Sequence, residues 1–220
     1  MKTTKSYRAV AMTLCAVLMF IIVPLHQAKA ETVSAMSGLI SFVNSSIDTS
    51  KGRIEVTRHQ IEEYVFAHKE GLLAESNQSN LTVSSLTESI YSLVQSANAD
   101  ASAGKSVIMP DGRTVSFPRD FSTRGNDIKE EFFWWGVRRT YLTDAAALAY
   151  VAELRRARNA SEVIESITRY IHPAAHVLAK LNTWYAKTLG DSIEWAAKQP
   201  GNGVVVEMTY VLTYTAVPRK

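Results

Sequence analysis

Cysteine is almost absent from this sequence. The single one, Cys15, lies within the first thirty residues, so residues 31–220 contain no thiol. A disulfide framework, a cysteine nucleophile and a cysteine-based metal site are therefore excluded for that part of the chain. Long apolar runs are scarce too. The run from Ala9 to Val23 has fifteen residues, fewer than the roughly 20 that a membrane-spanning helix needs.

That apolar run belongs to a pattern typical of a secretory signal peptide. Lys2, Lys5 and Arg8 form a positive start, the apolar run follows, and Ala28-Lys29-Ala30 supplies small residues at a cleavage site. We predict a signal peptide over residues 1–30, with cleavage after Ala30. The mature protein is then secreted and lacks cysteine altogether.

A surplus of basic residues is also missing from the mature chain. The whole sequence has a formal net charge of +3, but residues 1–30 hold four basic residues and no acidic ones. The remaining 20 basic and 21 acidic residues give a net charge of −1. A nucleic-acid partner is therefore not expected, because phosphate binding needs a surplus of lysine and arginine.

Motifs for nucleophilic, phosphate and glycosidase chemistry are missing as well. No Gly-x-Ser-x-Gly sequence occurs. The Gly-Lys-Ser sequence at 104–106 lacks the earlier glycine of a phosphate-binding loop, because Ala99 stands in its place. Glu130 and Glu131 are adjacent, so on a strand they point to opposite faces and do not pair as two catalytic carboxylates.

Two histidines four residues apart, His172 and His176, are the candidates for metal chemistry. On a helix this spacing places both imidazoles on one face, where they can bind a metal ion. A zinc protease would carry a glutamate between them, whereas this chain has Pro-Ala-Ala. Pro173 also favours His172 as a cap outside the helix. A solvated helix start is the alternative interpretation, and no other residues indicate a cofactor.

What the chain does have is a dense aromatic stretch within 130–142, which includes Trp134 and Trp135, two of its four tryptophans. Each ring buries roughly 150–250 Å², so we expect a strand here that is covered on both faces. Arg138 and Arg139 follow the rings. They either stack on an aromatic ring, contact an anionic surface or partner together with the tryptophans, or form salt bridges to Glu130, Glu131 or Asp144.

The predicted fold is α+β. A helical N-terminal region covers residues 31–104, and its best helix places Leu86, Ile90 and Val94 on one apolar stripe. An α+β domain covers 105–220. We expect it to contain a small antiparallel sheet covered by helices. The sheet comprises a hairpin over 106–117 and paired strands over 130–142 and 203–217, and the helices span 143–158, 161–171 and 173–198.

Two short motifs also suggest a family. Phe-Phe-Trp-Trp-Gly at 132–136 and Gly-Asn-Gly-Val at 201–204 resemble those of a loose group of small exported proteins from Gram-positive bacteria, some of them bacteriocin-like. The group has a WWG strand, a helical hairpin and a closing GxGV strand. Its middle helices are rich in glycine and alanine, whereas those of this chain carry several charges, which argues against a membrane-inserting hairpin.

These observations favour a secreted, non-enzymatic protein that acts on an extracellular target or the cell envelope, with peripheral membrane contact and a bacteriocin-like activity as options. A secreted metal-dependent hydrolase that uses His172 and His176 is an alternative. A structural or interaction module built on the N-terminal helices is another.

The hydrolase hypothesis makes a simple prediction. If His172 and His176 bind a structural or catalytic metal, the purified, folded protein should contain about one equivalent of zinc or a similar ion. Elemental analysis beside a circular dichroism spectrum measures this. A folded protein free of metal would contradict the hydrolase hypothesis.

Overall fold

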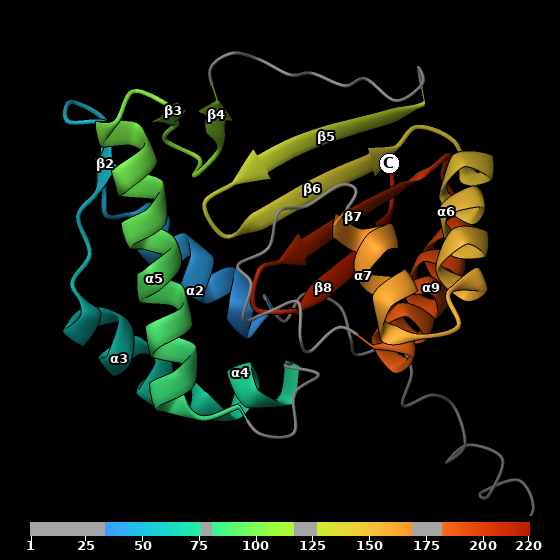
Figure 1. The fold of residues 1–220 in the computed structure, drawn as a ribbon, viewed down its shortest axis with the longest axis horizontal. Helices are drawn as coiled ribbons and strands as arrows, with labels where there is room; N and C mark the ends of the chain where they lie inside the picture. The colour runs from blue at the N-terminus through green and yellow to red at the C-terminus, as the bar shows by residue number, and fades with distance from the viewer. Residues whose placement is uncertain (1–33, 76–80, 117–126, 169–181) are drawn as a thin grey trace, which may run out of the picture. The chain divides into compact units, whose positions relative to one another are not determined.

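The computed structural model describes residues 34–75, 81–116, 127–168 and 182–220, and residues from Ser34 to Lys220 form one compact unit (Figure 1). The predicted α+β fold class is confirmed. Two groups of buried side chains fill this unit. We call the group among the N-terminal helices the helical core, and the group between the largest sheet and the later helices the sheet core.

The N-terminal part is helical, as predicted. Threonine hydroxyls begin two of its helices, because Thr57 and Thr82 each form a capping box with the residue three positions later. The predicted stripe of Leu86, Ile90 and Val94 is buried in the helical core. The elements are α2 (Ala35–Asn44), β1 (Ile47–Asp48), β2 (Arg53–Ile54), α3 (Arg58–Ala67), α4 (Lys69–Glu75) and α5 (Val83–Ser102).

A short hairpin follows, also as predicted. Strands β3 (Ser106–Ile108) and β4 (Thr114–Ser116) pair antiparallel, and Gly112 occupies the turn with φ near +85°. The two strands form a sheet of their own. Their turn nevertheless contacts the next hairpin, because the Trp134 amide donates to the Gly112 carbonyl at 3.1 Å.

The two long predicted strands are each two strands joined by a turn, which corrects the sequence-based boundaries. In place of one strand over 130–142, the chain forms β5 (Ile128–Phe133) and β6 (Gly136–Tyr141), with the turn at Trp134 and Trp135. In place of 203–217, it forms β7 (Val204–Thr209) and β8 (Tyr214–Pro218). The four strands make one antiparallel sheet in the order β5-β6-β7-β8.

The turns explain both corrections. Along a single strand, successive side chains point to opposite faces. At the tip of a hairpin, by contrast, both indoles can enter the same core, and Trp134 and Trp135 both pack in the helical core. The β5–β6 register also places Glu130 opposite Arg139 and Glu131 opposite Arg138, so each cross-strand pair joins opposite charges. In the second turn, Leu212 has a positive φ near +66°. Glycine usually occupies such a position, so no residue type in the sequence indicates this turn.

The predicted contact between the aromatic and valine-rich segments is confirmed, because β6 pairs with β7 from Gly136–Thr209 to Tyr141–Val204. Helices α6 (Asp144–Arg156), α7 (Ala160–Thr168) and α9 (Thr183–Ala197) pack against this sheet and complete the sheet core. The start of the predicted helix 173–198, from 173 to 181, lies outside the described residues.

Two glycines bound the β6–β7 ladder, and both belong to the short motifs noted above. A methyl group at Gly136 would overlap the Met208 carbonyl oxygen, and one at Gly203 would overlap the Tyr141 carbonyl oxygen. Backbone atoms cannot rotate away as a side chain can. Both motif glycines are therefore required by the close approach of neighbouring backbones.

Replacing Gly136 with alanine should lower the free energy of unfolding by about 3 kcal/mol or more, because β6 and β7 must move apart. Gly190→Ala is the matched control. Its methyl would meet the nearest side-chain atom, Cγ1 of Val151, at an ordinary 3.7 Å, and alanine is favoured inside a helix by up to about 1 kcal/mol. Urea unfolding measures the free energy of unfolding of both variants. Equal losses of stability would contradict a special requirement for glycine at position 136.

Candidate functional site

The two tryptophans expected to form a contact surface are core residues. Trp134 is 2% exposed and Trp135 is 4% exposed, and both pack in the helical core. The Trp134 indole N–H donates to the Asn44 side-chain oxygen at 2.7 Å, and the Trp135 ring stacks on Phe133 at 4.7 Å. This burial corrects the expectation that the paired indoles contact a partner.

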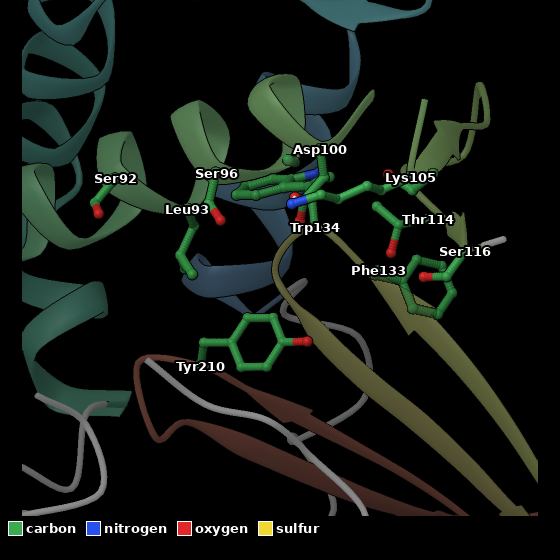
Figure 2. Close-up of a pocket in the computed structure, with 12 residues that line it drawn as sticks. Ser92, Leu93, Ser96, Asp100, Lys105, Thr114, Ser116, Phe133, Trp134 and Tyr210 are labelled. Carbon is green, nitrogen blue, oxygen red and sulfur yellow. The ribbon is translucent and has the colours of Figure 1, made fainter. Parts of the chain in front are cut away.

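One edge of the Trp134 ring nevertheless reaches a pocket of about 310 Å³, which we call the junction pocket (Figure 2). Side chains converge on it from α5, from β3 and β4, from the β5–β6 hairpin and from the β7–β8 turn. Its lining combines aromatic rings with hydroxyl groups and one ion pair, Lys105 with Asp100 at 3.7 Å. Polar and aromatic groups that meet in a concave space make it a candidate binding site.

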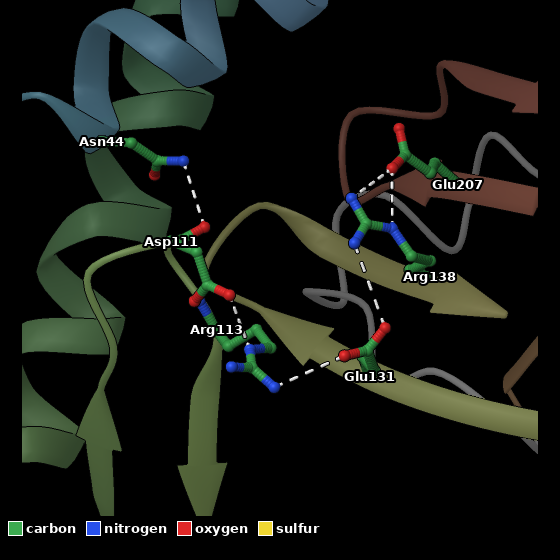
Figure 3. A network of polar contacts seen from close by, with 6 residues as sticks. All are labelled: Asn44, Asp111, Arg113, Glu131, Arg138 and Glu207. Atoms are coloured by element: carbon green, nitrogen blue, oxygen red, sulfur yellow. Dashed lines mark hydrogen bonds and ion pairs between the residues drawn. The ribbon is translucent and has the colours of Figure 1, made fainter.

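Arg138 lies beside this pocket in a network of alternating charges (Figure 3). Its guanidinium donates two hydrogen bonds to one carboxylate oxygen of Glu207, at 2.7 and 2.8 Å, and approaches Glu131 at 3.9 Å. Arg113 continues the network, from Glu131 at 3.4 Å to Asp111 at 2.7 Å. The predicted salt bridge from this arginine to a nearby acid is confirmed.

The charged network spans the β3–β4 turn and strands β5, β6 and β7. Its side chains are partly exposed, between 28% and 52%, and exposed pairs of this kind each contribute at most about 1 kcal/mol. The network therefore aligns the strands more than it stabilises them. It also engages both Arg138 and Arg113 with carboxylates of the protein itself.

Arg139 points to the opposite face of the sheet and is buried, with 1% exposure. Its Nε lies 2.9 Å from a Glu130 carboxylate oxygen. Its guanidinium also lies over the Tyr150 ring at 4.7 Å and the Tyr141 ring at 5.2 Å, which favours the cation electrostatically. Arg139 is therefore a core residue and not a surface contact, and its predicted salt bridge to Glu130 is confirmed.

The candidate metal ligands His172 and His176 lie outside the described residues. Within the described ranges, no group of three or more histidine, cysteine, aspartate or glutamate residues could hold a metal ion. The metal hypothesis for His172 and His176 therefore stays a prediction.

The remaining two tryptophans are the residues that the sequence analysis missed. Trp184 is 52% exposed and Trp195 is 60% exposed, both on α9. Tyr185, Leu189 and Ile193 on the same helix are buried in the sheet core. The signal was present in the sequence, because neither tryptophan falls on the apolar stripe that those three residues define.

A search of protein-family models, curated proteins and solved structures finds no match to this chain. The resemblance to exported Gram-positive proteins therefore stays a prediction. Among the helices of the described ranges, none is both long enough and apolar enough to cross a bilayer.

Replacing Glu130 with glutamine should lower the free energy of unfolding by about 3 kcal/mol, because the buried Arg139 guanidinium would lose the carboxylate beside its Nε. Glu131→Gln is the neighbouring control on the opposite face. Its carboxylate is 39% exposed and pairs at 3.4 and 3.9 Å, so its loss should cost less than about 1 kcal/mol. Thermal unfolding measures the stability of both variants. Similar losses of stability would refute a special role for the buried pair of Glu130 and Arg139.

Proposed function

We propose that this chain is an exported, non-enzymatic protein of the cell envelope that contacts a lipid surface through the outer face of α9. The observation that carries the proposal is the pair of exposed rings, Trp184 and Trp195. The signal-peptide pattern of residues 1–30 supports export.

The two rings share one side of the helix. At 3.6 residues per turn, positions eleven apart lie within about 20° of each other, roughly 16 Å apart along the axis. The opposite side of α9 is buried against the sheet, with Tyr185, Leu189 and Ile193 all 3% exposed or less. The helix is therefore held in place from behind and presents both rings outward.

Tryptophan suits a membrane interface because its ring is largely apolar while its N–H needs a polar partner. Lys187, beside the rings, is exposed and can lie near lipid phosphates. The acids on this helix are engaged internally, since Asp191 pairs with Arg155 at 3.0 Å and Glu194 pairs with Lys198 at 2.6 Å. The outer face thus combines two exposed aromatic rings with paired charges and the exposed Lys187.

The test uses the chain from Glu31, so that the apolar run near the N-terminus cannot itself insert, and vesicles of phosphatidylglycerol and phosphatidylcholine. Each half-exposed ring should contribute roughly 1–2 kcal/mol on leaving water. The double variant Trp184→Ala, Trp195→Ala should therefore reduce co-sedimentation with vesicles at least about tenfold.

Phe66→Ala is the matched control, because Phe66 is an equally exposed ring at 63% but lies on α3. It should bind vesicles as the parent chain does. Absence of binding by the parent chain, or equal loss in Phe66→Ala, would refute the proposal. Release of an entrapped dye would extend it to a membrane-disrupting, bacteriocin-like activity.

A further inference from the structure

The hydroxyl groups around the junction pocket make no hydrogen bond to another residue of the described ranges. On α5, the Ser89 hydroxyl donates to the Ser85 carbonyl one turn earlier at 2.8 Å. Ser92 and Ser96, which follow Ser89 on the pocket side of α5, make no such bond. A hydroxyl offers one donor and two acceptor positions, so the whole set is available to a ligand: Ser92, Ser96, Ser106, Thr114 and Ser116.

Ser106 is the most informative member of this set. It is only 8% exposed, and its hydroxyl has no partner among the residues that the structure describes. Its oxygen is not itself fully buried, so the hydroxyl is open to the pocket and can bond a ligand there. Strand pairing sets Ser106 directly opposite Ser116, which brings two of the hydroxyls together on the pocket side of the hairpin.

Aromatic rings supply the other part of the lining. Phe133, Trp134 and Tyr210 all contribute to the pocket wall. Trp134 and Phe133 are buried, and the Trp134 N–H is engaged by Asn44. Tyr210 is partly exposed, so it is the ring that a ligand in the pocket can contact. Burial raises the pKa of Tyr210, so its phenol stays neutral and able to donate or accept a hydrogen bond.

The charges at the pocket cancel. Lys105 and Asp100 form the ion pair at its rim, at 3.7 Å, and the other lining residues are neutral. A phosphate or other anion would meet a carboxylate there, so a neutral ligand fits better. The volume of about 310 Å³ lies at the small end of ligand pockets, which span about 300–1,000 Å³.

We propose that the junction pocket binds a single neutral sugar ring, either free or at the end of a glycan chain. One side of such a ring carries C–H groups that pack on the electron-rich face of an aromatic ring. Its hydroxyls alternate as donors and acceptors, which matches the serine and threonine hydroxyls around the wall. This site is separate from the outer face of α9 and does not depend on it.

Calorimetric titration of the full-length chain tests the proposal, with D-glucose, N-acetyl-D-glucosamine and its trimer as probes. We expect saturable binding of at least one of them at millimolar concentration or below. Equal affinity for monomer and trimer would indicate that one ring is recognised, and tighter trimer binding would indicate a chain end. Both results support the proposal.

The double variant Ser96→Ala, Ser106→Ala should weaken that binding at least about tenfold, because two hydrogen bonds are lost. Ser84→Ala is the matched control, an exposed serine on α5 that does not line the pocket, and it should bind as the parent chain does. Unchanged thermal unfolding of all variants shows that the fold is intact. No sugar binding up to about 20 mM, saturable binding of inorganic phosphate in place of sugar, or equal weakening in Ser84→Ala would overturn the proposal.

Discussion

The rest of the structure depends on how closely the backbones of β6 and β7 approach. At one end of their ladder Gly136 faces the Met208 carbonyl, and at the other end Gly203 faces the Tyr141 carbonyl, with no room for a methyl group at either position. This pairing fixes the register of the whole sheet. It places Val137 and Tyr141 toward α6 and α9, and it places Arg138 on the opposite face beside Glu207. The two glycine motifs that suggested a family are therefore explained by strand packing alone.

The β5–β6 hairpin connects the two cores. Its strands contribute Val137 and Tyr141 to the sheet core, while its tip contributes Phe133, Trp134 and Trp135 to the helical core. The charged network and the junction pocket both lie where this hairpin meets the β3–β4 turn and α5. The same tip that stabilises the fold thus shapes the site.

Much of this architecture follows from local patterns in the sequence. The apolar stripe at Leu86, Ile90 and Val94 predicted α5, and the alternation after Gly203 predicted a strand that pairs with the aromatic segment. The turns inside both long segments escaped prediction for different reasons. The first has two tryptophans where turn residues are expected, and its signal lay in the mirror arrangement of Glu130–Glu131 and Arg138–Arg139. The second depends on a positive φ at Leu212, which only tertiary packing can enforce.

The four tryptophans show why the functional candidates changed more than the fold did. Adjacent rings such as Trp134 and Trp135 expose so much apolar surface together that the chain must enclose them, so density in the sequence indicates burial. A single tryptophan among polar residues of a helix carries no such penalty, and the helix can leave it in water. Trp184 and Trp195 are of this kind, since the buried side of α9 is already complete without them. The position of both exposed rings on one side of α9 is what supports the proposed lipid contact.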